Sequence, residues 1–274
     1  MSLSKKVDFA VIFSVKNANP NGDPLNSNRP RINYDGIGEV SDVCIKRKVR
    51  DRLLESCREI FVQSDDRKTD GATSLRNRAE TAFGKKLGEI DIVKKACAKW
   101  FDVRAFGQVF AYKGDEKKDG SGVSIGIRGP VTIQSAFSVD PVNVTSTQIT
   151  KSVSGEDGKD GKRASDTIGM KHRVDDGIYY FFGSMNPQLS EKTGFSDEDA
   201  RAIKDVLPKI FENDASSARP DGSMRVLKVF WWEHNSKSGQ YSSAKVHESL
   251  KVKHDGSYEL SALDGLVPEV IDGF

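Results

Sequence analysis

Amide and guanidinium side chains cluster around a proline- and glycine-rich stretch close to the start of the chain. Residues 17–31 read N-A-N-P-N-G-D-P-L-N-S-N-R-P-R, and residues 42–50 read D-V-C-I-K-R-K-V-R. A loop that leads into a basic helix brings main-chain N–H groups, amides and guanidinium groups together, and such groups bind phosphate oxygens. The spacing therefore predicts contacts to a phosphate backbone. The side chains that offer these contacts are Asn17, Asn19, Asn21, Asn26, Asn28, Arg29 and Arg31 in the loop, and Lys46, Arg47 and Arg50 on the helix.

A second group of chemically active side chains, M-K-H-R, lies at residues 170–173. His172 beside Lys171 and Arg173 is an electrostatic setting in which a histidine could cleave RNA, but general acid–base cleavage needs a second convergent group. An RNA contact or a structural role for His172 is therefore favoured over catalysis. His172 with Asp175 and Asp176 is the nearest approach to a metal site, and solvated carboxylates at a turn are the simpler interpretation.

Two sequence signatures of nucleotide and RNA recognition are missing. Glycine-rich stretches occur without the lysine of a phosphate-binding loop. The Lys/Arg-Gly-Phe-Gly-Phe run with which RNA-recognition-motif (RRM) domains stack bases is also absent. We therefore expect any RNA contact to use the backbone, and we expect neither a metal nor a cofactor.

The overall composition is that of a soluble protein. The chain has 274 residues, 30% charged and 36% apolar, and a net charge of +2 that is biased toward positive potential in the first half. This bias fits a local groove for an anionic ligand. The three cysteines are widely spaced and fit neither a disulfide framework nor a zinc site. The start of the chain lacks the apolar region of a signal peptide, which predicts a cytoplasmic location.

Apolar periodicity predicts the elements that position these residues. The first half predicts a buried strand at Val7–Val15, a loop at 17–30, an amphipathic helix at Asp42–Val62 with a basic outer face, a strand at Val103–Tyr112 and a long strand at Val123–Val139 that is interrupted at Gly129-Pro130. The second half predicts a strand at Ile178–Met185, a helix from Ser196 to about Glu212, a strand at Met224–Trp232 and a tail with a further strand or two and a weak helix.

Strand, helix, strand, strand, helix, strand is the order of a ferredoxin-like, RRM-like α+β sheet. Two polar stretches interrupt it. Residues 63–100 predict an insertion between core elements. Residues 140–173 contain no aromatic residue and are rich in glycine, serine and charge, which predicts a projection without a core of its own. We expect one elaborated domain over 1–274 with these two insertions.

The motifs resemble those of the Cas-seven family, the backbone subunits of Cascade-type CRISPR surveillance complexes, and most closely its type I-C (Csd) branch. The resemblance rests on N-P-N-G-D-P, N-R-P-R and D-V-C-I-K-R-K-V-R, and on four later stretches. These are W-F-D-V-R-A-F-G at 100–107, I-R-G-P-V-T-I-Q at 127–134, S-V-D-P-V at 138–142 and G-M-K-H-R-V at 169–174. The final third resembles the family mainly in pattern.

The resemblance implies a modified RRM-like palm with a helical finger insertion at 63–100 and a thumb β-hairpin at 140–173. It implies copies of the chain that polymerise as a helical filament along a CRISPR RNA, which pairs with target DNA in antiviral defence. Further partners would be a Cas-five-type subunit and a large subunit, and the chain itself would not be an enzyme. The implied RNA-binding residues are Asn19, Asn21, Arg29, Arg31, Lys46, Arg47, Arg50, Met170, Lys171, His172 and Arg173.

The thumb would displace one nucleotide at regular intervals. Because no aromatic residue is available there, the candidate wedge residues are Val142, Val144 and Ile149. An alternative function is that of an RNA-cleaving filament subunit, as in type III complexes, which use a thumb aspartate. The candidates for that role are Asp140, Asp157, Asp160 and Asp166. A scaffold that binds no nucleic acid is a third alternative.

Overall fold

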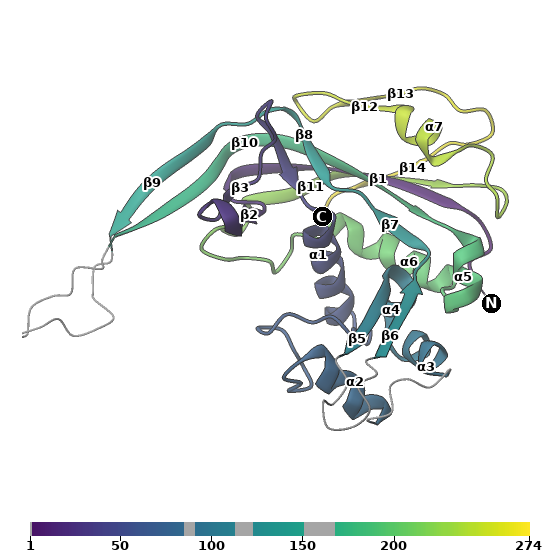
Figure 1. The fold of residues 1–274 in the computed structure, drawn as a ribbon. Helices are drawn as coiled ribbons and strands as arrows, with labels where there is room; N and C mark the ends of the chain where they lie inside the picture. The colour runs from purple at the N-terminus through teal and green to yellow at the C-terminus, as the bar shows by residue number, and fades with distance from the viewer. Residues whose placement is uncertain (1, 85–90, 113–122, 151–167) are drawn as a thin grey trace, which may run out of the picture.

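A computed structural model describes residues 2–84, 91–112, 123–150 and 168–274. Its main feature is an antiparallel sheet, with the strand order β14-β11-β1-β10-β8-β4 (Figure 1). β7 and β9 also pair with β10. The strands are β1 (Val7–Ala18), β4 (Ile37–Val40), β7 (Val131–Ile133), β8 (Ala136–Pro141), β9 (Val144–Thr150), β10 (Ile168–Met185), β11 (Met224–Glu233) and β14 (Glu269–Asp272).

The connections confirm the predicted RRM-like α+β fold. The chain runs β1–α1–β8 and then β10–α6–β11, with α1 at Asp42–Glu55 and α6 at Asp197–Val206. In the sheet β10 lies between β1 and β8, and β1 lies between β10 and β11. The two strand–helix–strand units therefore interleave, which is the split βαβ arrangement.

One face of the sheet packs against α1 and α6. From α1, Ile45, Val49 and Leu53 are fully buried at spacings of four, and Phe9 and Phe13 of β1 belong to the same core cluster. Ser41 caps α1 through its hydroxyl, which accepts from Cys44 N–H. Ser196 and Asp199 form a capping box at α6. Capping and apolar spacing thus place both helices as the sequence predicts.

Both helices are shorter than predicted. α1 ends at Glu55 because Cys57 adopts a left-handed conformation with φ 60°, which turns the chain away before Val62. α6 ends at Val206 and continues as a single 3-10 turn, η3 (Leu207–Lys209). Pro208 lies inside η3, and a proline has no N–H with which to continue an α-helix.

The opposite face of the sheet is covered by the C-terminal segment, which contains α7 (Ser243–Glu248), β12 (Leu250–Val252) and β13 (Tyr258–Leu260) (Figure 1). Phe230 and Trp232 of β11 are fully buried there, and Tyr258 meets the Phe230 ring edge-on at 4.7 Å. In RRM domains this is the face on which bases stack. Its aromatic side chains are already occupied in this protein.

A separate apolar cluster holds the insertion together. It contains α2 (Leu75–Phe83), α3 (Ile92–Lys99), α4 (Phe101–Phe106), β5 (Gly107–Tyr112) and β6 (Val123–Arg128). Phe61, Trp100 and Phe110 form its centre. The ring centroid of Phe61 lies 4.5 Å from that of Trp100 and 5.2 Å from that of Phe110. The boundaries of this unit differ from the predicted 63–100, because β5 and β6 pair with each other outside the main sheet.

Two predicted strands need correction. Residues 103–106 were expected to be extended, but they belong to α4, whose Phe101 and Ala105 pack in the main core. The stretch 123–139 is interrupted at the predicted Gly129-Pro130, yet its two halves join different sheets. A Cβ at Gly129 would lie 2.3 Å from the carbonyl oxygen of Ala105, so only glycine permits this crossing.

A long hairpin of β9 and β10 extends beyond the helices at one end of the sheet (Figure 1). Beside it lies a short hairpin of β2 (Gly22–Asp23) and β3 (Arg29–Pro30), joined by the 3-10 turn η1 (Pro24–Asn26). α5 (Pro187–Thr193) follows β10 at the other end. Among the described residues, no helix is long and apolar enough to span a membrane.

The C-terminal segment is joined to β1 by a buried polar cluster. Asp8 is fully buried, and its carboxylate accepts from His234 Nε2 at 2.8 Å and pairs with Lys6 Nζ at 3.2 Å. His247 Nε2 of α7 lies 3.4 Å from the second oxygen. Burial opposes ionisation of Asp8, but the neighbouring His234 and His247 side chains and Lys6 outweigh it, and the pKa of Asp8 is lowered.

Replacing Asp8 with Asn should destabilise the protein by roughly 2 kcal/mol, because His234 and the partly buried Lys6 lose a buried anionic partner. Urea unfolding at pH 7 measures this loss. Asp205→Asn, at an exposed position of α6, is the matched control and should change the free energy of unfolding by less than about 0.5 kcal/mol. Equal stability of the two variants would contradict a structural role for Asp8.

Candidate nucleic-acid interface

The asparagines of the predicted phosphate loop shape the loop itself. Asn19 is buried, and its amide donates to the carbonyl of Asn28 at 2.7 Å. The Asn21 carbonyl oxygen accepts from both the N–H and the hydroxyl of Ser41, at 2.9 and 2.8 Å. Asn21 therefore supports the residue that caps α1. The side chains of Asn19 and Asn21 position the loop, and the groups left to contact a ligand are mainly its cations.

The loop also depends on glycine and on left-handed residues. A Cβ at Gly22 would lie 1.9 Å from the side-chain oxygen of Asn28. Asn17, Ser27 and Asn28 have positive φ values of 52°, 50° and 58°. Asparagine tolerates this conformation better than most residues. The asparagine-rich sequence is therefore explained in large part by turn geometry.

Arg29 connects the loop to the long hairpin. Its Nη1 donates to Ser146 Oγ of β9 at 2.7 Å and lies 3.5 Å from His172 Nδ1 of β10. The Ser146 hydroxyl lies 2.9 Å from the same Nδ1. With Nδ1 as the acceptor of both contacts, the imidazole proton is assigned to Nε2. The described residues provide no carboxylate partner for Arg29, so its charge is available to an anion.

The predicted residues of the hairpin point to opposite sides. Successive side chains of a strand alternate between the two faces of a sheet. His172, which is only 8% exposed, shares its face with its cross-strand neighbour Ser146 and with Met170. Lys171 and Arg173 lie on the other face. A ligand held beside Arg29 can therefore reach the face of His172 and Met170 but not that of Lys171 and Arg173.

The basic side of α1 differs most from its predicted role. Lys46 pairs with Asp42 at 2.8 Å, within the helix. Arg50 was expected on the outer surface, but its side chain is 13% exposed and pairs with Asp102 at 2.9 Å. Its guanidinium also lies over the Phe106 ring. Arg50 therefore joins α1 to the insertion, because its carboxylate partner lies distant in sequence.

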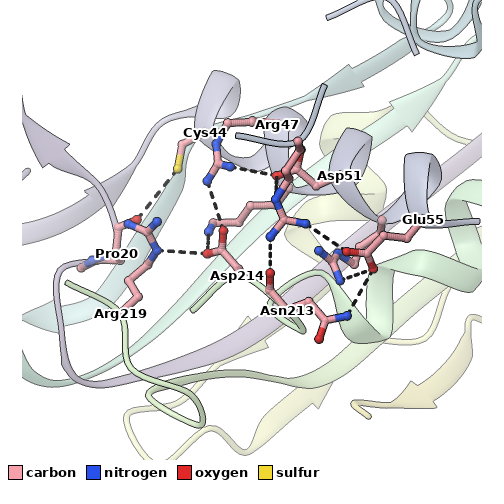
Figure 2. A network of polar contacts seen from close by, with 11 residues as sticks. Pro20, Cys44, Arg47, Asp51, Glu55, Asn213, Asp214 and Arg219 are labelled. Carbon is pink, nitrogen blue, oxygen red and sulfur yellow. Dashed lines mark hydrogen bonds and ion pairs between the residues drawn. The ribbon is translucent and has the colours of Figure 1, made fainter. Parts of the chain in front are cut away.

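Arg47 belongs to the ionic network shown in Figure 2. It pairs with Asp51 at 2.8 Å and with Asp214 at 3.2 Å, and 36% of its side chain remains exposed. Asp214 also pairs with the fully buried Lys48 and with Arg219, the latter at 3.0 Å. Three cations thus share one carboxylate.

The network holds the loop against α1. Cys44 of α1 contacts the Pro20 carbonyl through its thiol (Figure 2). Asn19 N–H donates to the carbonyl of Ala218, in the segment that carries Asp214 and Arg219. Burial opposes ionisation of Asp214, but the charges of Lys48, Arg219 and Arg47 outweigh it and lower its pKa. Asp214 is therefore ionised, and excess positive charge remains beside the loop.

The candidate wedge residues differ in exposure. Val142 and Val144 pack against the main core cluster. Ile149, near the described end of β9, is 49% exposed. Of the three, Ile149 has the most freedom to contact a ligand.

Of the candidate carboxylates, Asp140 is exposed and Asp175 accepts from Thr145 Oγ1 at 2.8 Å. The described part of the chain contains no group of three or more side chains arranged to bind a metal ion. Asp157, Asp160 and Asp166 lie outside the described residues.

Sequence reasoning missed three cations. Arg219 belongs to the network of Figure 2, and Lys16 and Arg225 lie exposed on neighbouring strands. Lys16 directly precedes the asparagine-rich loop, and Arg219 directly precedes a Pro-Asp-Gly turn, and both signals are visible in the sequence. The pairings that bring Arg219 to the loop, and that place Lys16 and Arg225 on the sheet face away from the helices, are not revealed by a single sequence.

The fold and the interface together define a class: an RRM-like α+β protein whose stacking face is covered and whose cations gather around a loop and a projecting hairpin. Comparison with protein families matches residues 5–264 to the family of CRISPR-associated protein Cas7. The chain belongs to this family, which confirms the Cas-seven prediction.

The individual relatives share low sequence identity with this chain. The CRISPR-associated protein Cas7 of Haloferax volcanii is 24% identical over 293 residues, covering 99% of this chain and 82% of that protein. A chain of a CRISPR RNA-guided surveillance complex, pre-nicking, has TM-score 0.49 and 18% identity, covering 83% of this chain and 75% of its own. A chain of a second CRISPR RNA-guided surveillance complex has TM-score 0.45 and 18% identity, covering 95% of this chain and 77% of that chain. A chain of a type III-B Cmr-beta complex bound to cognate target RNA has TM-score 0.42 and 12% identity, covering 83% of this chain and 61% of that chain.

Replacing Asp214 with Asn should lower the free energy of unfolding at pH 7 by roughly 3 kcal/mol, because Lys48 is then buried without its counter-charge. The pKa of Asp214 is lowered in the folded state. The stabilisation that ionised Asp214 provides is therefore complete at pH values above the unfolded-state pKa of about 3.9. It is lost as the pH falls below that value.

Urea unfolding of both proteins between pH 7 and pH 3 tests this dependence. The difference between the wild type and Asp214→Asn should narrow below about pH 4. A difference that is constant across this range would contradict an ionised Asp214 as the source of the stabilisation.

Proposed function

We propose that this Cas7-family chain is the CRISPR RNA-binding backbone subunit of a type I Cascade complex, of the type I-C branch. The observation that carries the proposal is the contact of Arg29 with Ser146 and His172. It places a guanidinium without a carboxylate partner in the described structure at the junction of the loop and the hairpin. Family membership supports an RNA ligand at this junction.

The guide RNA runs between the loop and the Ser146 face of the hairpin, along a path that we call the guide groove. Arg29 and Arg31 contact phosphates, and Arg47 and Arg219 add positive potential beside them. The aromatic residues of the sheet are covered, so bases do not stack there as in an RRM. Such a grip is independent of base sequence and leaves the bases free to pair with target DNA.

The projecting elements are assigned in the same way. The β9–β10 hairpin is the thumb, and Ile149, the most exposed of the three candidates, is the wedge that displaces a nucleotide. The unit around Phe61 and Trp100 is the finger. Further copies of the chain follow along the RNA as a filament, beside a Cas-five-type subunit and a large subunit.

Arg29→Ala should weaken binding of a spacer-length RNA by about 10- to 100-fold at 0.1 M salt, because a charge-assisted phosphate contact contributes about 1.5–3 kcal/mol. The salt dependence of binding should also fall by roughly one phosphate contact. Fluorescence anisotropy measures both quantities. Arg29→Lys, which keeps the charge but loses the fork, should bind with intermediate affinity.

The matched control is Arg201→Ala, an exposed arginine of α6 on the helical side. It should bind RNA as the wild type does. Circular dichroism verifies that the Arg29 variants remain folded. An Arg29→Ala variant that is folded and keeps wild-type affinity would refute the assignment of the groove.

The proposal also holds that the chain does not cut the RNA it binds. A labelled spacer-length RNA incubated with the protein and Mg²⁺ or Mn²⁺ should remain intact over hours on a denaturing gel. Regularly spaced fragments that disappear in Asp140→Asn would instead support the cleaving alternative of type III complexes.

A further inference from the structure

A second group of cations lies on the sheet face that points away from the helices. Lys16 of β1 and Arg225 of β11 are exposed there, as are Lys171 and Arg173 of β10. Lys16 alternates with the helix-facing Val15, and Arg225 lies between the helix-facing Met224 and Val226. We call these four residues the outer cationic strip.

The register places the first part of the strip beside the apolar cover. Ser14 pairs with Ile178 on one side and with Arg225 on the other, and Lys16 pairs with Asp176. Adjacent strands lie about 4.8 Å apart and alternate residues about 6.8 Å apart, so the Cα atoms of Lys16 and Arg225 are separated by roughly 8 Å. Long flexible side chains at this separation can reach neighbouring phosphates of one strand.

The cover of the sheet ends just before the strip. Gly256, in the turn between β12 and β13, lies beside Leu227 and Ile178, where a Cβ would be 2.8 and 3.5 Å from their side chains. Lys16 and Arg225 lie beyond this point and are exposed. The C-terminal segment thus covers the aromatic part of the face and leaves its cationic part open.

Most of the strip is not neutralised by the protein. Within the described residues, Lys16, Lys171 and Arg225 have no carboxylate within ion-pair distance, and Arg173 has Asp175 at 3.5 Å. Asp175 and Asp176 are the carboxylates of the neighbouring β10 segment. By contrast, most of the cations of α1 have carboxylate partners. The unpaired cations are available to an external anion.

The strip is separated from the proposed guide groove by the sheet itself. Arg29 and Ser146 contact His172, whose side chain points to the face opposite Lys171 and Arg173. A strand held against Arg29 therefore leaves the outer strip unoccupied. The strip needs a different ligand.

The chemistry of the strip favours a nucleic acid over a protein. Lysine is depleted at protein–protein interfaces, where aromatic residues and methionine are enriched. Here lysines and arginines are accompanied by Thr145 and Thr147, which share the hairpin face of Arg173 and Lys171. Hydroxyl groups and cations together are typical of phosphate contacts.

We propose that the outer cationic strip binds the phosphates of a second, single-stranded nucleic acid while the guide RNA occupies the opposite face. This inference rests on the proposed function for the identity of the first strand. The two strands lie on either side of the hairpin, and contacts to the second are independent of its sequence.

The test uses the double variant Lys16→Glu/Arg225→Glu and the full-length protein saturated with an unlabelled spacer-length RNA. The probe is a fluorescein-labelled thirty-nucleotide oligothymidine that is not complementary to the RNA. Its binding is measured by fluorescence anisotropy at about 0.1 M salt. The variant should bind the probe at least tenfold more weakly than the wild type, while its affinity for the RNA changes less than twofold. Lys171→Gln should weaken binding of the probe in the same direction.

The matched control Arg201→Glu/Lys209→Glu makes the same change of charge at exposed positions of α6 and η3, on the helical side. It should retain most of its affinity for the probe. Equal loss in the control, no loss in the variant, or no binding of the probe by the loaded wild type would overturn the proposal. Equal loss of RNA affinity in the variant would also overturn it, because the strip would then bind the guide.

The outcome separates the two proposals. If the wild type does not bind the spacer-length RNA, the proposed function fails. The same comparison of variant and control with the RNA-free protein then tests the strip alone, and a tenfold selective loss of the probe would still support it. In the RNA-free protein too, equal loss of probe binding in the variant and in the control would overturn the proposal for the strip.

Discussion

The buried ion pair between Lys48 and Asp214 is the constraint on which the basic end of the molecule depends. Lys48 belongs to the helix that packs on the sheet, and Asp214 belongs to the segment that follows the second helix. Arg47 and Arg219 share the same carboxylate, and the Ala218 carbonyl of the segment accepts from Asn19 N–H of the asparagine-rich loop. Helix α1, the segment after α6 and the asparagine-rich loop are thereby fixed together. Removing one partner of such a buried ion pair is strongly destabilising, because the other charge is left buried without a counter-charge.

The second constraint is that both faces of the sheet are already used. The helices cover one face, and the C-terminal segment covers the aromatic part of the other, around Phe230 and Trp232. In such a sheet the aromatic residues on which bases would stack are covered. At its edge lie the loop, the hairpin and Arg29, which has no carboxylate partner among the described residues.

Local signals predicted the fold well, and the partners of charged side chains poorly. The continuous apolar run Val7–Val15 and the helix start at Ser196 depend on neighbouring residues, and both appear as predicted. Arg50 illustrates the failure: its spacing indicated an outer surface, but Asp102, 52 positions away, pairs with it. The strand expected at 103–106 became helical because tertiary packing of Phe101 and Ala105 overrides local propensity. His172 stays a predicted RNA contact, and its contact with Arg29 was found only in the structure.

Site-specific cross-linking tests the central claim most directly. A spacer-length RNA containing 4-thiouridine would be bound to the full-length protein, irradiated, and its cross-linked peptides identified by mass spectrometry. We predict cross-links in the loop at 19–33 and on the hairpin around Ser146, Met170 and His172, with a marked decrease in Arg29→Ala. Cross-links confined to the C-terminal segment or to the insertion around Trp100, with none in the loop, would contradict the account.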